Sequence, residues 1–247
     1  MDLTDFFREC PRVALGFSGG VDSAYLLYAA LKEGAQVRPY FVKTAFQPQF
    51  ELEDAKRLAD QLGVEMTVLE VDILALPQVA ANPGDRCYHC KRALFGRLRD
   101  QAVKDGYPVL MDGTNASDDA GDRPGMRALG ELCVRSPLRE CGITKEEVRR
   151  RSKAADLFTW DKPAYACLAT RVPTGELIQP DTLRRVELGE EALRGLGFSD
   201  LRVRVFHGAA RLQLPADQLT RAVELRETIR RDLAPWFETV LLDLKER

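Results

Sequence analysis

Short apolar runs of strand length alternate with helix-length segments through the first 111 residues of the chain. Strands are expected at 13–17, 37–42, 65–71 and 109–111, and helices at 24–31, 51–62 and 90–103. Strands that alternate with helices form a parallel sheet with helices on both faces. The pattern therefore predicts an α/β fold that binds its ligand beyond the carboxyl ends of the strands.

The pattern changes after a turn-rich segment at 160–176. A helix is expected at 181–196, strands at 201–206 and 211–214, a long helix at 216–233, and a strand at 240–244. We therefore predict two domains, a larger α/β domain over residues 1–174 and a smaller α+β domain over residues 175–247.

Composition excludes several classes of protein. The 247 residues are 45% hydrophobic and 30% charged, and 36 basic side chains nearly balance 38 acidic ones. A net charge of -2 gives no overall attraction to nucleic acid or to an anionic membrane. The N-terminal residues lack the pattern of a secretory leader, and no apolar stretch reaches the length of a membrane span. We expect a cytoplasmic protein with neither nucleic acid nor membrane as a partner.

A glycine-rich turn, Ser18-Gly19-Gly20-Val21-Asp22-Ser23, joins the first expected strand to the first expected helix. Its glycines let the backbone approach an anion, and the free N–H groups of the helix start point at that anion. Ser18 and Ser23 can add hydroxyl donors, whereas Asp22 would repel a bare phosphate and so indicates Mg²⁺ between carboxylate and phosphate. The turn is neither a Walker A loop nor a dinucleotide fingerprint. It predicts a site for a metal-bound polyphosphate; the alternative is a serine-capped turn without a ligand.

A second fragment, Asp112-Gly113-Thr114-Asn115, follows the short strand at 109–111. The carboxyl ends of parallel strands share one edge of the sheet, so this fragment is expected beside the glycine-rich turn. Gly113 permits close approach to a bound nucleotide, and Thr114 is a further candidate contact. An Asp-Gly pair is also common in ordinary turns.

The six cysteines are not expected to form a disulfide framework in a reducing cytosol. Cys87 and Cys90 form a Cys-x-x-Cys pair near an expected helix start and can place two thiolates on one metal. A structural zinc site requires four ligands, and the chain has two histidines and no second such pair. Metal binding and simple packing both remain open for this pair. The other cysteines assigned to packing are Cys10, Cys133 and Cys141.

Cys167 lies in the turn-rich segment, four residues before Arg171. Loops are where a scaffold displays reactive groups, and an adjacent arginine favours a thiolate and can meet a phosphate or an oxyanion. The residues alone leave a reactive and a buried thiol equally open. Arg202 and Arg204 follow with a spacing of two, which puts both on one face of a strand. Anion binding and exposure to solvent are both open for these arginines.

Several segments in order resemble the LarE family of sulfur transferases, which are PP-loop ATP pyrophosphatases. They are SGGVDS, NPGDRCYHCK, DGTNASDDAGDRPGMRAL, RSPL and CLATRVPTGE, and the likeness covers essentially the whole chain. The resemblance implies a parallel-sheet adenine nucleotide alpha hydrolase-like domain, with the smaller α+β domain serving substrate binding or oligomerisation. It implies a homo-oligomeric enzyme that adenylates the carboxylates of pyridinium-3,5-biscarboxylic acid mononucleotide and converts them to thiocarboxylates for nickel-pincer nucleotide synthesis. In such an enzyme, residues 18–23 hold the pyrophosphate end of ATP with Mg²⁺.

The resemblance also implies roles for the cysteines and arginines. In one form of the family a cysteine matching Cys167 gives up its sulfur and becomes dehydroalanine. In the other form, cysteines matching Cys87, Cys90 and Cys167 hold a [4Fe-4S] cluster that binds sulfide from a sulfur donor, and the chain has all three. We predict the cluster form and keep sacrifice of Cys167 as the alternative. Arg202 and Arg204 would grip the substrate phosphate.

We predict that Cys167, Asp22 and Arg171 act in catalysis. Gln213 stands in the strand where family members place an acidic residue, so a metal site is not expected there. Other functions that fit a phosphate-binding turn are tRNA thiolation and a nucleotide or metal-binding module without turnover. An RNA-binding enzyme would need a basic groove and aromatic stacking platforms, and the near-neutral charge with 8% aromatic residues argues against one.

Overall fold

The computed structural model describes residues 2–118 and 124–245, which fall into two compact units. The first unit consists of Met1–Ile73 with Asp85–Lys162, and the second of Leu74–Gly84 with Pro163–Arg247. A compact unit need not fold on its own, so the predicted domain boundary between residues 174 and 175 stays a prediction. Residues 119–123 of the segment that resembles the LarE family lie outside the described residues.

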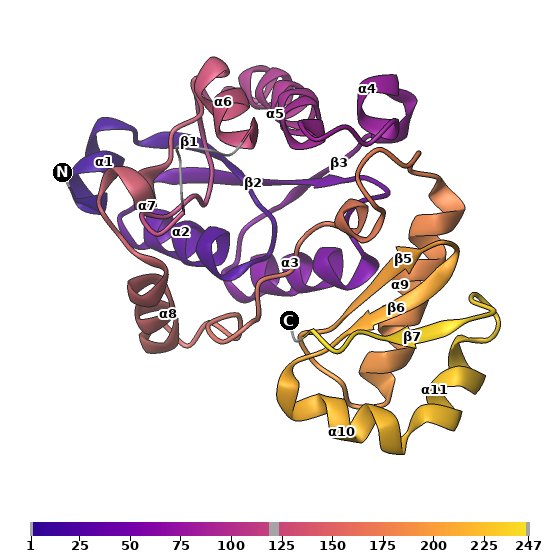
Figure 1. Cartoon of the computed structure of the whole chain (residues 1–247). Coiled ribbons are helices and arrows are strands. Elements are labelled where there is room, and N and C mark those ends of the chain that lie inside the picture. The colour runs from indigo at the N-terminus through magenta and orange to yellow at the C-terminus, as the bar shows by residue number, and fades with distance from the viewer. Residues whose placement is uncertain (1, 119–123, 246–247) are drawn as a thin grey trace. The chain divides into compact units, whose positions relative to one another are not determined.

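A parallel sheet forms the centre of the first unit, as predicted (Figure 1). Its strands run in the spatial order β3-β2-β1-β4, with all neighbouring pairs parallel. Their bounds are β1 Arg12–Gly16, β2 Gln36–Lys43, β3 Thr67–Glu70 and β4 Val109–Met111. Because β1 and β4 are neighbours, the segments that leave their carboxyl ends start side by side.

Helices cover both faces of this sheet (Figure 1). Val13 and Leu15 of β1 pack into one core with helix α2, whereas Ala14 between them packs into another core with Leu98 and Ala102 of helix α5. This alternation buries both faces of β1, as a central parallel strand requires. The α-helices of the first unit are α1 Leu3–Glu9, α2 Val21–Lys32, α3 Gln49–Gln61, α5 Arg86–Lys104, α6 Pro124–Glu131, α7 Pro137–Glu140 and α8 Lys145–Ala154.

The second unit contains a smaller sheet with the strand order β5-β6-β7. β5 and β6 are antiparallel, and β7 runs parallel to β6. The strands are β5 Arg202–Phe206, β6 Ala209–Gln213 and β7 Val240–Leu242. The helices are α4 Pro77–Ala80, α9 Pro180–Gly195, α10 Ala216–Glu224, α11 Arg226–Leu233 and the 3-10 helix η2 Leu168–Arg171; a further 3-10 helix, η1 Ile73–Ala75, spans the boundary between the units.

One predicted element of this unit is wrong. The long helix expected at 216–233 is two helices, because Leu225 leaves helical geometry with φ -89° and ψ 11°. Ala222 before this break and Ile229 after it are both buried, so the apolar periodicity continues across the bend. The sequence carries neither glycine nor proline at the break, which is why the pattern alone does not reveal it.

The two faces of the smaller sheet differ in chemistry. Val203 and Val205 of β5 are buried on one face, and a Cβ built on Gly189 of α9 would lie 3.6 Å from the Val203 side chain. Helix α9 therefore packs closely on that face. Arg202 and Arg204 alternate with these valines and lie half-buried on the other face. Among the described residues of both units, no helix is long and apolar enough to cross a membrane.

Candidate active site

The glycine-rich turn at residues 18–23, here called the phosphate turn, connects β1 to α2. Gly19 has φ +69°, and a Cβ on it would meet the backbone of Ala55 in α3 at 3.2 Å. Only glycine meets both conditions without strain. The hydroxyl of Ser23 donates to the Gly20 carbonyl at 3.1 Å and lies 3.1 Å from the Ser18 hydroxyl. The turn is thus fixed by its own side chains before any ligand binds.

Gly113 brings the second predicted fragment against this turn. A Cβ on Gly113 would lie 2.9 Å from the backbone nitrogen of Ser23, closer than real Cβ atoms approach. Asp112 is buried and fixes the fragment, since its carboxylate accepts hydrogen bonds from the hydroxyls of Ser136 at 2.7 Å and Thr114 at 2.5 Å. The predicted proximity of residues 112–115 to the phosphate turn is therefore present in the structure.

Asp22 is charge-balanced by a lysine that the sequence analysis did not identify. Lys145 Nζ lies 2.5 Å from one carboxylate oxygen of Asp22, and the Asn115 side-chain amide donates to the other at 3.2 Å. Thr144 caps α8 by accepting from the Glu147 N–H, which leaves Lys145 as the first residue of the helix. A cation at a helix N-terminus opposes the helix dipole, and this conflict is the signal that could have identified Lys145.

Lys162 is a second lysine near the phosphate turn that the sequence analysis did not assign to the site. Its ammonium lies 2.6 Å from an Asp54 carboxylate oxygen and 3.4 Å from the Gly19 carbonyl oxygen. Arg149 donates to the carbonyls of Trp160 and Lys162 at 2.8 and 2.9 Å. The end of the first unit is thus fixed both to α8 and to the turn.

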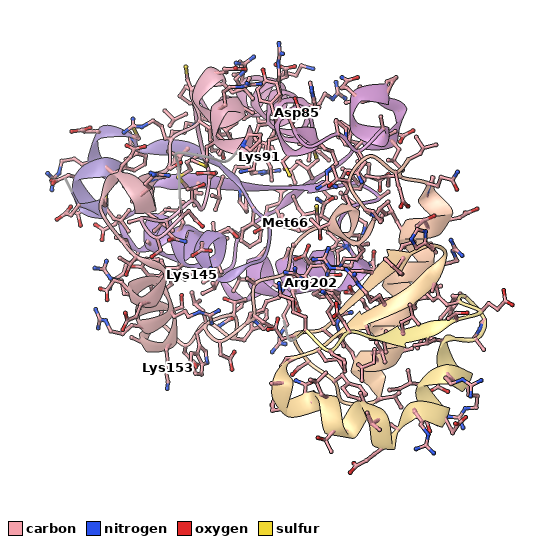
Figure 2. The ribbon with its side chains drawn as sticks, viewed as in Figure 1. Met66, Asp85, Lys91, Lys145, Lys153 and Arg202 are labelled. Carbon is pink, nitrogen blue, oxygen red and sulfur yellow. The ribbon has the colours of Figure 1, made fainter. Side chains whose placement is uncertain are left out.

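A cavity of about 540 Å³ is bordered by the phosphate turn, residues 112–114 and α5. Its lining includes Ser18, Asp22, Ser23, Asp112, Gly113, Thr114, Cys87 and Lys91. Lys91 of α5 lines the cavity directly, whereas Lys145 of α8, on the opposite face of the sheet, reaches it only through its ion pair with Asp22 (Figure 2). A cavity of several hundred Å³ with polar groups on one wall is the size of a nucleotide site. The residues present therefore fit ATP, although their roles as ATP ligands stay a prediction.

Cys87 and Cys90 are the second and fifth residues of α5, which begins at Arg86, four residues earlier than predicted. Cys87 is exposed and lines the cavity, and Cys90 is half-buried. Arg86 Nη2 lies 3.6 Å from the Cys87 sulfur. Within residues 2–118 and 124–245, no group of three His, Cys, Asp or Glu side chains is placed to hold a metal. Cys167 belongs to the other unit, so the three-cysteine ligand set stays a prediction.

The turn that carries Cys167 is held by its backbone. Thr170 donates to the Cys167 carbonyl through both its N–H at 3.0 Å and its hydroxyl at 2.9 Å. Arg171 donates to the Ala166 carbonyl at 2.9 Å. Hydrogen bonds therefore fix the carbonyl groups of both Ala166 and Cys167. The Cys167 thiol itself is half-buried.

Arg171 is only 1% exposed and forms an ion pair with Glu190 of α9 at 2.7 Å. The Tyr165 hydroxyl donates to the same carboxylate at 2.6 Å, and burial together with this neighbouring charge raises the pKa of Tyr165 above its usual range. Glu190 therefore anchors the Cys167 turn, a role that the sequence analysis did not assign. The predicted catalytic role of Arg171 stays a prediction, and its described contacts place it in the support of the turn.

Comparison with known proteins agrees with this geometry. The family model of the queuosine biosynthesis protein QueC matches residues 12–82, which include the phosphate turn. An uncharacterized protein of Synechocystis sp. is 40% identical over 226 residues, covering 90% of this chain and 84% of its own. The tRNA-specific 2-thiouridylase MnmA of Thermotoga petrophila is 29% identical over 145 residues, covering 48% of this chain and 40% of its own.

The likeness to one enzyme of known activity extends over almost the whole chain. The pyridinium-3,5-bisthiocarboxylic acid mononucleotide synthase of Lactiplantibacillus plantarum is 30% identical over 245 residues, covering 98% of this chain and 89% of its own. The aligned length includes the phosphate turn, the Cys-x-x-Cys pair and the Cys167 turn. The chain therefore belongs to the LarE family of PP-loop sulfur transferases, and it is an ATP-using enzyme.

Proposed function

We propose that this enzyme adenylates the carboxylates of pyridinium-3,5-biscarboxylic acid mononucleotide with ATP and replaces the activated oxygen with sulfur. The cavity at the phosphate turn is the observation that carries the proposal. Gly19 and Gly113 each lack room for a side chain because backbone of another segment lies against them. These contacts fix the two segments beside the N-terminus of α2, whose free N–H groups suit the oxygen atoms of a polyphosphate. The 30% identity to the mononucleotide synthase supports the choice of substrate.

Asp22 is the residue in the cavity that would hold Mg²⁺. Its two oxygens already pair with Lys145 and Asn115, so the site can supply both a hard oxygen ligand and a cation for phosphate. Bound Mg²⁺ would neutralise part of the phosphate charge. Lys145 would then turn from Asp22 to the phosphate oxygens, and the charge of the carboxylate would remain balanced throughout.

The chemistry follows from the need for a leaving group. A substrate carboxylate oxygen attacks the α-phosphorus of ATP, and pyrophosphate departs with the electrons of the broken P–O bond. A sulfur nucleophile then attacks the adenylated carbonyl carbon, and AMP leaves with the oxygen that bridged carbon and phosphorus. The chain fixes the pyrophosphate end through the phosphate turn and shields the activated carbonyl from water within the cavity.

The sulfur source that we favour uses Cys87, Cys90 and Cys167. Thiolates are the ligands of a [4Fe-4S] cluster. Cys87 is exposed, and Cys90 and Cys167 are half-buried rather than sealed in a core. A bound cluster would hold the sulfide that a sulfur donor supplies. The chain contributes the spacing of Cys87 and Cys90 in one helical turn and the fixed backbone around Cys167.

The alternative uses the sulfur of Cys167 itself. Its thiolate attacks the adenylated carbonyl and AMP departs, leaving a thioester. Removal of the Cys167 Cα proton then breaks its Cβ–S bond, so that the thiocarboxylate leaves with the sulfur and dehydroalanine remains. Each molecule of enzyme would transfer one sulfur atom by this route.

An anaerobic single-turnover experiment tests the proposal. The protein, reconstituted with iron and sulfide, is mixed with MgATP and the biscarboxylic acid mononucleotide, and AMP, pyrophosphate and the product mass are measured. We expect AMP and thiocarboxylate in equal amounts, and loss of the thiocarboxylate in Cys87→Ala and Cys167→Ala. Cys133→Ala is the matched control, because Cys133 is exposed and does not line the cavity.

The outcomes separate the two sulfur sources. Cluster delivery leaves the protein mass unchanged and requires Cys87. Sacrifice of Cys167 lowers the protein mass by one hydrogen sulfide and proceeds in Cys87→Ala. Accumulation of ADP in place of AMP would refute adenylation and with it the whole proposal.

A further inference from the structure

The face of the smaller sheet opposite Val203 and Val205 carries a cluster of arginines. Arg204 of β5 lies directly opposite Arg211 of β6 in the antiparallel register, and Arg202 lies opposite Gln213. Residues paired across strands share a face, so Arg202, Arg204 and Arg211 all lie on the side away from Val203. We call this set the arginine cluster. It lies wholly within the second unit.

Like charges directly opposite in a sheet destabilise it unless another group balances them. Burial, followed by the positive charges of Arg202, Arg171 and Arg211, lowers the pKa of Arg204. Burial and Arg171 lower the pKa of Arg202 in the same way. The arrangement therefore costs folding free energy in the absence of an anion.

The counter-charge on this face is incomplete. Asp243 lies 3.5 Å from Arg211 Nε, and its carboxylate also accepts a hydrogen bond from the Gln213 amide at 2.9 Å. The Nε atoms of Arg202 and Arg211 are buried without a hydrogen-bond partner among the described residues. A buried donor without an acceptor costs free energy. Arg202 Nε therefore indicates an acceptor that the described residues do not supply, and Arg211 Nε faces only the Asp243 carboxylate, at 3.5 Å.

The arginine cluster is joined to the Cys167 turn. Arg204 Nη1 donates to the Thr170 carbonyl at 2.7 Å, and Thr170 in turn donates to the Cys167 carbonyl. An anion held by the cluster is therefore fixed relative to the residue predicted to deliver or hold sulfur. Arg211 is itself placed by Phe206, whose ring centroid lies 5.5 Å from the guanidinium carbon.

We propose that Arg211 is the third arginine of a phosphate monoester site, in which Arg202, Arg204 and Arg211 together select a mononucleotide over the corresponding nucleoside. The proposal deepens the proposed function, on which the identity of the nucleotide rests. Arginine suits this role because its planar fork donates two parallel hydrogen bonds to phosphate oxygens. Three guanidinium groups match a dianion better than the two that the sequence pattern identified.

Direct binding without ATP tests this proposal separately from sulfur transfer. Calorimetry measures the binding of inorganic phosphate, nicotinic acid mononucleotide and nicotinic acid riboside. The proteins compared are the native protein, Arg211→Gln and Arg231→Gln. Arg231 of α11 is 73% exposed and serves as the matched control. We expect Arg211→Gln to lower the affinity for phosphate and for the mononucleotide at least about tenfold. This is the scale of one lost charge-assisted hydrogen bond. Riboside binding and the control are expected to be unchanged.

Two further readouts distinguish ligand binding from a structural role. Arg211→Gln removes both the like-charge contact with Arg204 and the ion pair with Asp243, so without phosphate its melting temperature should stay close to that of the native protein, and phosphate should raise it less. Mononucleotide affinity of the native protein should weaken as pH falls through about 6, where a phosphate monoester gains a proton, and the variant should respond less.

Equal phosphate affinity in the native protein and Arg211→Gln, or no phosphate binding to the native protein, would overturn the proposal. Mononucleotide binding that depends on Arg211, in a protein that makes no thiocarboxylate, would support the phosphate site and refute the proposed function alone.

Discussion

Gly113→Ala is the substitution that most directly tests the phosphate turn. The added Cβ would lie 2.9 Å from the backbone nitrogen of Ser23, 3.2 Å from its Cα and 3.3 Å from the carbonyl carbon of Asp22. All three are backbone atoms in the first turn of α2, so no side-chain rotation relieves the contact. Overpacking of this kind costs about 1–3 kcal/mol. If α2 moves to accept the methyl group, that cost becomes a loss of ATP affinity of about 5- to 150-fold.

The assay is calorimetry with a non-hydrolysable ATP analogue and Mg²⁺, together with thermal unfolding of the free protein. Gly96→Ala is the matched control, because Gly96 lies within α5 and a Cβ there meets nothing within 4 Å. This control should gain about 0.5–1 kcal/mol of helix stability and bind the analogue like the native protein. Native-like ATP affinity in a normally folded Gly113→Ala protein would refute the assignment of the turn.

Two more predictions concern charged groups. Lys145→Ala should weaken MgATP binding, because Asp22 would then face the phosphates without its cation; calorimetry at low and high salt should show a loss that shrinks as salt screens the repulsion. The Arg135 hydrogen bond holds the pKa of Glu140 below its usual value, so this stabilisation is present above the unfolded pKa and lost as pH falls through the folded one. Glu140→Gln should therefore cost about 0.5–1 kcal/mol in urea unfolding at pH 7 and little at pH 3, and an equal loss at both pH values would contradict this account.

The elements of the fold were predictable where local pattern decides them. The β1 to β4 strands and the helices α2, α3 and α5 between them follow from apolar runs, and a glycine, Gly34, Gly63 or Gly106, stands just beyond the end of each helix. Long-range pairing is not visible in such a pattern. Residues 74–84 belong with the second unit because the buried Asn82 amide donates to the carbonyls of Val172 and Pro173. Those partners lie about ninety positions away in the sequence.

The same division applies to the site. Residues 18–23 and 112–115 were identified because glycine-rich segments after strands carry a recognisable pattern, and the structure brings them together. Lys145, Lys162 and Glu190 were not assigned functions because each acts on a residue distant in the sequence. A lysine or glutamate within a helix resembles an ordinary surface charge until its partner is known. Burial is what distinguishes Glu190, whose side chain is fully inaccessible.

The lysines at the phosphate turn resolve the apparent conflict of placing a carboxylate in the proposed anion site. Asp22 pairs with Lys145 and Asp54 pairs with Lys162, so each acid beside the turn has a cation from a later segment of the chain. In the proposed site, an exchange in which the acid turns to Mg²⁺ and the lysine to phosphate would leave no charge unbalanced at any stage. Asp22 and Lys145 should therefore act as one unit in MgATP binding. The loss of MgATP affinity when both residues are neutralised should be smaller than the sum of the losses when each is neutralised alone.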